Sequence, residues 1–380
     1  MDTETPRSRS SVDVPFVDLS YPDSAVRGAI ANEHESLVDA GAFVNGPAVE
    51  RFEREFAAYC GVTFCIGLAS GLDALRLALL GLGLEPGAEV MVPAMTFVAT
   101  FEAVEQAGLV PVPIDVRPDD CGIDPAAVDA AVGPRTAALL PVHLYGQIAS
   151  MSALLERARS DSIAVLEDAC QAHGAVRDGV RAGSFAQAGA FSFYPAKNLG
   201  AWGDAGALVT DDGELARVVR ALREHGQTRK YHSEFSGYTA RLDAMQAVVL
   251  SEKLRLLDDC NERRRAAAAA YCDKLAGVGD LTLPTEVEGS HHVWHLFTVR
   301  TAEPVALGDH LASRGISTGR HYPEPPHLSP AFAHLGYREG SFPVAEAIAR
   351  ETLSLPIYPG ISDEQVELVA SGVKSYFDRG

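Results

Sequence analysis

Short apolar runs alternate with amphipathic stretches between Val62 and Thr210, and this alternation constrains the fold more than any other feature of the chain. The runs have the length of buried strands and the stretches between them have helical periodicity, which is the pattern of βαβ units. The sequence therefore predicts an α/β fold with a mostly parallel central sheet and helices on both faces. The expected strands are Thr63–Leu68, Glu89–Val92, Val110–Ile114, Ala137–Val142, Ile163–Leu166, Gly189–Phe193 and Ala207–Thr210, with helices beginning near Leu72, Phe97, Pro125 and Ser150.

The pattern changes after Asp212 to longer helices and then to a smaller unit. A chain of 380 residues is long enough for one large and one smaller domain. We expect an N-terminal tail at residues 1–14, a large domain at 15–250 and a small C-terminal α/β domain at 251–380. In the later part of the chain the expected helices are Asp243–Asp258, Leu307–Arg314, Val344–Thr352 and Asp363–Phe377, with a strand at His295–Val299.

The composition of the chain argues against several functional classes. The formal net charge of −19 argues against a nucleic-acid or anionic-membrane binder, because phosphate surfaces require clustered Lys and Arg. The N-terminal segment has no apolar core typical of a secretory signal, and no apolar stretch approaches the ~20 residues of a membrane span. The six cysteines lack zinc or redox spacing. These features predict a cytoplasmic protein with reduced thiols and no metal site.

Two chemically active residues follow neighbouring strands. Asp168 falls at the carboxyl end of the run from Ile163, and Lys197 follows the run that ends near Phe193. Open α/β sheets bind ligands at this edge. A lysine amine that faces a carboxylate across a cleft suits pyridoxal phosphate (PLP), because the amine forms a Schiff base while the acid pairs with the pyridine nitrogen. Taken singly, Asp168 could instead cap a helix and Lys197 could lie on the surface.

Other residues complete the outline of a cofactor site. The turn from Ser70 to Leu72 opens a helix whose free amides suit a phosphate, although an ordinary Ser N-cap would have the same sequence. Phe97 lies at the next strand-to-helix turn and could stack on a flat ring or belong to the core. Gln171 and His173 follow Asp168 and could hold it or the phenolic oxygen of the cofactor.

These residues lie in motifs that together resemble the DegT/DnrJ/StrS-type sugar aminotransferases. The resemblance extends from about Pro15 to the C-terminus. The motifs are Ala69-Ser70-Gly71 with Ala74-Leu75, Val92-Pro93 with Thr96-Phe97-Val98-Ala99-Thr100, Pro141-Val142-His143-Leu144-Tyr145-Gly146, Glu167-Asp168-Ala169 with Gln171-Ala172-His173-Gly174, Phe191-Ser192-Phe193-Tyr194-Pro195 with Lys197-Asn198-Leu199-Gly200, and Arg241-Leu242-Asp243.

The resemblance implies a fold-type I PLP-dependent transferase that forms a homodimer with active sites at the subunit interface. It implies that Lys197 and Asp168 are catalytic, with Lys197 as the Schiff-base lysine. The cofactor contacts implied are Gly71, Leu72, Phe97, Asp168, Gln171, Ser192, Lys197, Asn198 and Thr239. Leu72 stands where the family often has Thr, and Thr239 stands where an Asn from the partner subunit usually reaches the phosphate.

Two loops bring basic and aromatic residues together in an otherwise acidic chain. Both resemble the substrate-facing loops of family members that act on nucleotide-linked keto-sugars, most closely the branch that aminates a dTDP-linked 3-keto-6-deoxyhexose. L-Glutamate is the expected amino donor, and the mechanism is expected to be ping-pong. The residues expected to contact the substrate are Tyr194, Arg229, Lys230, Tyr231, His321 and Tyr322.

Several alternatives remain open at the level of sequence. The acceptor could be a 4-keto-sugar nucleotide, or a free cyclitol ketone with glutamine as donor. A related dehydratase would carry histidine in place of Lys197 and some add an iron–sulfur cluster, but Lys197 is present and no cysteine follows Cys272. A non-catalytic regulatory or sensing protein on the same scaffold would not need both Lys197 and Asp168.

Overall fold

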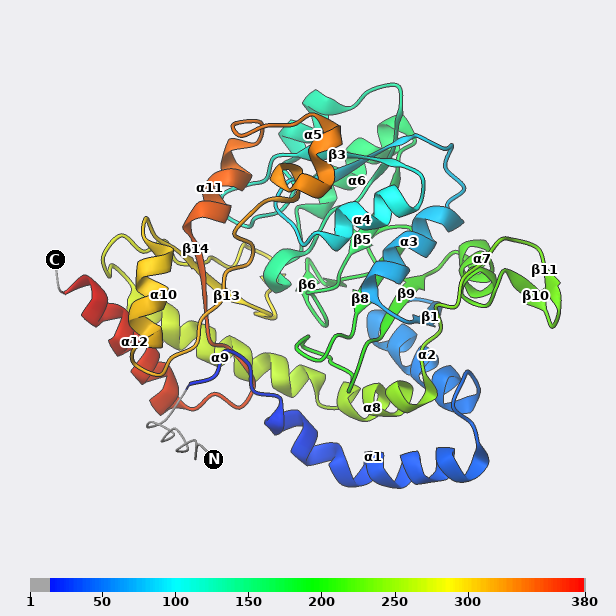
Figure 1. Cartoon of the computed structure of the whole chain (residues 1–380), viewed down its shortest axis with the longest axis horizontal. Helices are drawn as coiled ribbons and strands as arrows, with labels where there is room; N and C mark the ends of the chain where they lie inside the picture. The colour runs from blue at the N-terminus through cyan, green and yellow to red at the C-terminus, as the bar shows by residue number, and fades with distance from the viewer. Residues whose placement is uncertain (1–13, 379–380) are drawn as a thin grey trace, which may run out of the picture.

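The computed structural model describes residues 14–378, so residues 1–13 of the predicted tail lie outside the described part (Figure 1). Val14 is buried, and its amide donates to the Gly315 carbonyl oxygen at 2.8 Å. The helices are α1 (Ser20–Ala40), α2 (Pro47–Cys60), α3 (Gly71–Gly81), α4 (Ala99–Gln106), α5 (Pro125–Ala131), α6 (Met151–Asp161), α7 (Gly213–Arg223), α8 (Ala244–Leu254), α9 (Leu257–Leu275), α10 (Pro304–Ala312), α11 (Pro343–Glu351) and α12 (Asp363–Phe377), with 3-10 turns η1 (Leu144–Gly146), η2 (Pro326–Leu328) and η3 (Pro330–Leu335).

One seven-stranded sheet organises the larger part of the chain. Its order is β1-β9-β8-β5-β4-β2-β3, and β9 runs antiparallel to both neighbours while the remaining neighbours are parallel. The predicted α/β class with a mostly parallel sheet is therefore confirmed. The strands of this sheet are β1 (Phe64–Leu68), β2 (Glu89–Pro93), β3 (Val110–Ile114), β4 (Thr136–Leu139), β5 (Ala164–Asp168), β8 (Ala188–Ser192) and β9 (Gly206–Thr210).

Shorter strands lie outside this sheet. They form a three-stranded sheet, the hairpin β10–β11 and the pair β13–β14. Their bounds are β6 (Val176–Arg177), β7 (Val180–Arg181), β10 (Gln227–Arg229), β11 (His232–Ser233), β12 (Ser290–His291), β13 (Phe297–Arg300) and β14 (Thr352–Leu355).

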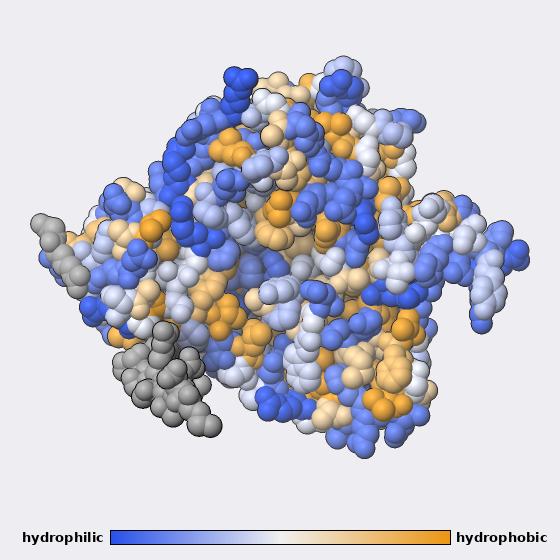
Figure 2. Space-filling model, viewed as in Figure 1, coloured by the Kyte–Doolittle hydropathy of each residue, from blue (hydrophilic) through white to orange (hydrophobic). Residues whose placement is uncertain are grey.

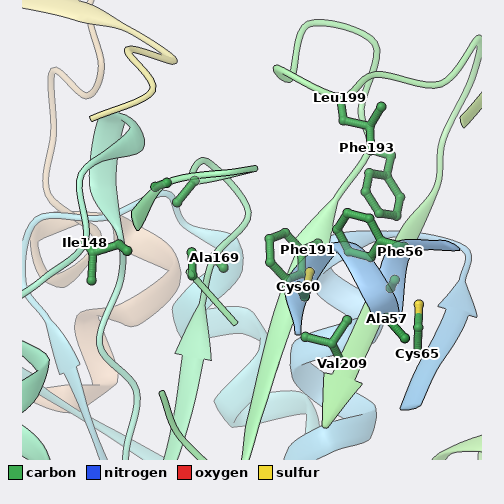
Figure 3. Packing of buried hydrophobic residues seen from close by; sticks show 14 of the residues in the cluster. Phe56, Ala57, Cys60, Cys65, Ile148, Ala169, Phe191, Phe193, Leu199 and Val209 are labelled. Carbon is green, nitrogen blue, oxygen red and sulfur yellow. The ribbon is translucent and has the colours of Figure 1, made fainter. Parts of the chain in front are cut away.

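Helices cover both faces of the large sheet because its strands are apolar on both sides. In β9, Ala207 and Val209 join the core cluster under α2 and α8, whereas Leu208 joins the cluster under α3 and α7. Aromatic rings fill the first cluster, where Phe56 meets Phe191 and Phe193 edge-on at centroid distances of 5.0 and 5.2 Å (Figure 3). This packing fixes β8 and the loop that leaves it.

Several predicted boundaries were wrong in detail. β5 extends to Asp168, so the acid ends the strand itself rather than following it. The helix predicted at Asp243–Asp258 is divided into α8 and α9. The two helices serve different cores, since α8 packs on α1 and α2 while the later part of α9 packs on α12. Thr352 begins β14 instead of ending a helix, because β14 pairs with β13.

The later part of the chain builds a separate core from α9, α10, α12, β13 and β14. This core lies on the left of Figure 1, and α8 and α9 run below the large sheet towards it. A domain boundary near residue 250 stays a proposal, since α8 packs with the large core and α9 joins the small one from Ala267 onwards. None of the helices in the described residues 14–378 is long and apolar enough to cross a membrane.

Candidate active site

A cavity of ≈ 600 Å³ opens beside the carboxyl ends of β5 and β8. Loops of the large sheet form one wall, and segments near residues 295, 321 and 357 of the smaller unit form another. This is the edge where parallel α/β sheets bind ligands. Most of the residues singled out in the sequence line this one cavity: Gly71, Leu72, Phe97, Asp168, Gln171, Ser192, Tyr194, Lys197, His321 and Tyr322.

Asp168 is held rigidly at the end of β5. Its side chain is buried, Thr100 Oγ1 donates to Oδ2 at 2.9 Å, and the Cys170 amide donates to Oδ1 at 3.2 Å. Thr100 Oγ1 also lies 2.8 Å from the hydroxyl oxygen of Thr96, which lies between β2 and α4. These donors orient a carboxylate towards the cavity, where it could pair with a cationic ring nitrogen.

Lys197 lies in the loop after β8, where its amide donates to the Tyr194 carbonyl oxygen at 2.8 Å. Burial in the cavity lowers the pKa of its amine, although Cys170 and Asp168 act in the opposite direction. A lowered pKa increases the fraction of neutral amine, which is the nucleophilic form. The acid and the amine predicted from separate loops therefore meet in one site.

The amino end of α3 forms a cradle for an anion. Ser70 caps this helix by accepting a hydrogen bond from the Asp73 amide at 3.0 Å, and the first amides of the helix have no partner inside it. A Cβ at Gly71 would lie 2.7 Å from Cβ of Ser192 and 2.8 Å from Sγ of Cys170. Only glycine lets Ser192 approach the helix this closely. The Ser192 hydroxyl and the α3 amides thus converge as phosphate ligands do.

Phe97 and Tyr322 form an aromatic wall. Their ring centroids are 5.4 Å apart, and half of the Phe97 side chain is exposed towards the cavity. Gln171 accepts a hydrogen bond from the Tyr145 amide at 2.7 Å and donates to the Tyr322 hydroxyl at 3.0 Å. The amide nitrogen of Gln171 keeps a second hydrogen for a ligand oxygen. This geometry suits a flat aromatic cofactor with a ring oxygen.

His321 and His295 add imidazoles to the smaller unit's wall. Burial and the charge of Lys197 lower the pKa of His321 to about 4. His321 Nδ1 lies 2.9 Å from the Ser354 hydroxyl, and its ring stacks on Phe16 at 5.4 Å. Burial, and secondly Lys197, also lower the pKa of His295. Both rings are therefore neutral near pH 7.

Asn198 lies beside the cavity but does not line it. Its Nδ2 donates to Asn261 Oδ1 and to the Val293 carbonyl oxygen, both at 2.8 Å. Both amide hydrogens are thus used, so its Oδ1 accepts from Nδ1 of His295 at 3.3 Å. The Asn198 side chain thus fixes the Lys197 loop and the His295 tautomer, and its contact with the cofactor stays a prediction.

His173, which sequence reasoning placed near the cofactor, is fully buried between Phe191 and Phe193. Neither ring nitrogen has a hydrogen-bond partner among the described residues. Burial and the charge of Lys197 lower its pKa to about 3. His173 therefore packs behind the site as a neutral ring.

Thr239 and the predicted substrate residues Arg229, Lys230 and Tyr231 do not join the cavity of this chain. Tyr231 is 88% exposed, and Thr239 Oγ1 lies 3.3 Å from His225 Nε2. Figure 1 shows that the β10–β11 hairpin projects away from the sheet, and Figure 2 shows it as mostly hydrophilic.

Sequence reasoning missed the contributions of Thr100, His295 and Arg264. Thr100 stands four residues after Thr96, and the closeness of the two hydroxyl residues in the sequence was the available signal. His295 and Arg264 line the cavity from segments whose position depends on the packing of the smaller unit. Within residues 14–378, no group of three or more His, Cys, Asp or Glu side chains could hold a metal ion.

Comparison with known proteins gives a consistent result. The sequence profile of the DegT/DnrJ/EryC1/StrS aminotransferase family matches residues 25–374. A dTDP-3-amino-3,4,6-trideoxy-alpha-D-glucose transaminase from Streptomyces venezuelae is 47% identical over 376 residues, which cover 99% of this chain and 98% of the relative.

Solved structures agree. The crystal structure of S. venezuelae DesV in complex with a ketimine intermediate has a TM-score of 0.95 at 47% identity, and the match covers 97% of this chain and 99% of that one. NtdA from Bacillus subtilis with bound cofactor PMP has a TM-score of 0.90 at 31% identity, covering 98% of this chain and 86% of that one.

Proposed function

The chain belongs to the DegT/DnrJ/EryC1/StrS aminotransferase family, whose enzymes depend on PLP, and we propose that it moves an amino group from L-glutamate to a keto-sugar nucleotide. The acceptor we favour is a dTDP-linked 3-keto-6-deoxyhexose, in the biosynthesis of a deoxyamino sugar. The name of the S. venezuelae relative, a dTDP-3-amino sugar transaminase, supports this choice. The two half-reactions would follow each other in ping-pong order.

The observation that carries the proposal is the convergence of an amine, a carboxylate, an anion cradle and an aromatic wall in one cavity. The cradle excludes even a methyl group at Gly71, as expected where a phosphate meets backbone amides. The residues present therefore fit PLP. When bound, PLP supplies an electron sink for a carbanion next to the transferred nitrogen.

Each residue has a distinct proposed task. Lys197 would hold the cofactor covalently, and its amine, once free, would move the proton between carbon and nitrogen. Asp168, oriented by Thr100, would keep the ring nitrogen protonated. Phe97 would pack on the ring and Gln171 would donate its second amide hydrogen to the ring oxygen.

The cofactor phosphate would bind at the amino end of α3. Gly71 and Leu72 offer backbone amides, and Ser192 offers its hydroxyl. Leu72 supplies no side-chain hydroxyl, so Ser192 is the side chain expected to contribute most there.

The covalent attachment has a direct test. Borohydride reduction of the PLP-loaded protein should yield a modified peptide that contains Lys197, and Lys197→Ala should abolish it. A reducible adduct that persists in Lys197→Ala would place the attachment elsewhere. Lys230→Ala is a matched control because Lys230 lies on the exposed hairpin, and it should keep the adduct.

The acceptor is tested with panels of dTDP- and UDP-linked 3-keto and 4-keto sugars and free cyclitol ketones, each with L-glutamate or L-glutamine. Amination of a dTDP-linked 3-keto sugar with L-glutamate is the expected result. If only a free cyclitol ketone is aminated, the nucleotide-sugar proposal is wrong. If no ketone is aminated, a non-catalytic protein on this scaffold is favoured. Tyr194, His321 and Tyr322 line the cavity and are the proposed sugar contacts.

A homodimer with shared active sites is also part of the proposal. Arg229, Lys230, Tyr231 and Thr239 lie outside the cavity of their own chain. The first three nevertheless carry the basic and aromatic groups that a nucleoside diphosphate requires. Co-expression of Lys197→Ala with an Arg229→Ala/Lys230→Ala chain should restore activity if the hairpin acts on the partner's site. Activity no higher than that of either variant alone would contradict sharing. A cytoplasmic location stays a prediction of the sequence.

A further inference from the structure

Arg264 is a buried cation without a buried anion. It lies in the middle of α9 and is 4% exposed, and among the described residues it forms no ion pair. Guanidinium groups are strongly disfavoured in the interior unless a carboxylate or another anion balances their charge. Arg264 therefore differs from its neighbours Arg263 and Arg265, which pair with Asp259 and Glu286.

Backbone carbonyls satisfy only one end of the guanidinium. Nη1 donates to the carbonyl oxygens of Trp294, His295 and Ile357 at 3.2, 3.4 and 2.9 Å. Nε is buried with no partner among the described residues. The hydrogen bonds that the guanidinium donates to described residues all come from Nη1. Burial lowers the pKa of Arg264 to about 10, so the group is still a cation near pH 7.

The side chain of Arg264 lines the same cavity as Lys197. It belongs to the wall made by the smaller unit, together with His295 and Ile357. The anion cradle at Gly71 and Ser192 belongs to the other wall and is reserved for the cofactor phosphate under the proposed function. A second cationic group, separate from the anion cradle, thus lines the cavity that contains the reacting amine.

The carboxylates of the cavity do not fill this position. Asp168 is held by Thr100 and the Cys170 amide, and Glu102 and Asp204 line the cavity without an ion pair to Arg264. No carboxylate among the described residues therefore balances the charge of Arg264.

We propose that Arg264 binds a carboxylate of the amino donor through Nη2, while its Nη1 is anchored to the backbone. This inference rests on the amino-donor half of the proposed function and is independent of which sugar is the acceptor. A carboxylate next to the lysine would place the donor's amino group for transfer, and the anchored Nη1 would limit the guanidinium's movement. Ketone recognition and the phosphate cradle would not involve Arg264.

The two half-reactions separate this role from a structural one. Absorbance changes of the bound cofactor report the reaction of the PLP form with L-glutamate and, separately, of the pyridoxamine form with the keto-sugar. In Arg264→Gln we expect the half-saturating L-glutamate concentration to rise about tenfold to a hundredfold, because one charge-assisted hydrogen bond to the donor is lost. The half-saturating keto-sugar concentration should stay within about twofold, because no contact of Arg264 would be lost there.

Arg263→Gln is the matched control, since Arg263 lies on the same helix but its side chain is 47% exposed and pairs with Asp259. It should change neither half-reaction. If Arg264→Gln does not fold, Arg264→Lys keeps the charge but loses the second guanidinium nitrogen, and the L-glutamate value should again rise.

Glutarate provides a readout without turnover, because it has carboxylates but no amino group. It should perturb the absorbance of the PLP-loaded wild type and bind more weakly to the Arg264 variants. An unchanged L-glutamate value with weaker thermal stability, or equal losses in both half-reactions, would overturn the proposal and make Arg264 a structural tie. Failure of the wild type to react with L-glutamate would instead refute the proposed function itself.

Discussion

Glu167 precedes Asp168 in the sequence, and its replacement tests how strongly buried hydrogen bonds stabilise the structure around the site. Its carboxylate is fully buried and accepts four hydrogen bonds. Oε1 accepts from the amides of Phe185 and Ala186 at 2.8 and 3.0 Å, and Oε2 accepts from the Gly183 amide at 2.7 Å. The fourth donor is Nε2 of His143 at 2.9 Å.

The tautomer of His143 is fixed by its other nitrogen. Nδ1 of His143 accepts from the Ala149 amide at 3.3 Å, so the proton of the neutral ring lies on Nε2. Glu167→Gln keeps one carbonyl oxygen for Phe185 and Ala186. Its new amide group would face two donors, the Gly183 amide and His143 Nε2, and neither could be satisfied.

The magnitude follows from these two lost bonds. A hydrogen bond to a charged group contributes about 1.5–3 kcal/mol, so Glu167→Gln should cost roughly 3–6 kcal/mol of unfolding free energy. Unfolding entropy of about 2.1 cal/mol/K per residue gives roughly 0.8 kcal/mol/K for 380 residues. The melting temperature should therefore fall by about 4–8 °C.

The assay is thermal unfolding of the PLP-loaded protein at one fixed protein concentration, because ligands and association also shift the midpoint. Glu234→Gln is the control, since Glu234 makes an exposed pair with Arg217 and should change the midpoint little. A Glu167→Gln midpoint within about 1 °C of the wild type would refute the four-donor account of Glu167.

Three further predictions test the site. Thr100→Val should weaken PLP binding and raise the apparent pKa of the bound cofactor's absorbance transition, by less than Asp168→Ala changes that pKa. Thr100→Ser should match the wild type. A Thr100→Val protein identical to the wild type would show that the hydroxyl does not orient Asp168. Gly71→Ala should raise the PLP dissociation constant about fivefold to a hundredfold, because overpacking costs about 1–3 kcal/mol. Adding Cys170→Ala should recover part of the lost affinity. The dissociation constants are measured by equilibrium dialysis, and an unchanged affinity would contradict the anion cradle. His173 stays neutral in the folded protein but gains a proton on unfolding below about pH 6.5, so the free energy of unfolding should fall as the pH drops below that value. In urea unfolding between about pH 6 and pH 5, His173→Leu should reduce the pH dependence of the unfolding free energy by about 1.4 kcal/mol per pH unit. An unaltered pH dependence would mean that other groups take up the proton.

The residues predicted most reliably from sequence are those attached directly to strands. Asp168 and Ser192 end β5 and β8, and Gly71 begins the helix after β1, so the order of the sheet alone brings their positions to one edge. Lys197 follows within the short loop after β8. Their placement required only the strand pattern and the rule that parallel strands end on the same side.

Asn198 and Thr239 show where this reasoning reaches its limit. Asn198 directly follows Lys197, yet its side chain turns to Asn261 and Val293, residues far along the chain. Thr239 follows the β10–β11 hairpin in the chain and lies outside the cavity, so its contact with a cofactor phosphate stays a prediction. Sequence adjacency does not determine the direction of a side chain, because packing partners decide it.

Local periodicity and chain direction were enough to predict the sheet, the edge where ligands bind and the presence of Asp168 and Lys197 in one cavity. The groups that complete the site could not be predicted in this way, because they depend on packing between distant segments. Thr100 reaches Asp168 across 68 residues of sequence, and Arg264 and His295 line the cavity because the smaller unit packs against the large sheet. Such contacts follow from burial and charge balance in the assembled fold, which no local pattern encodes.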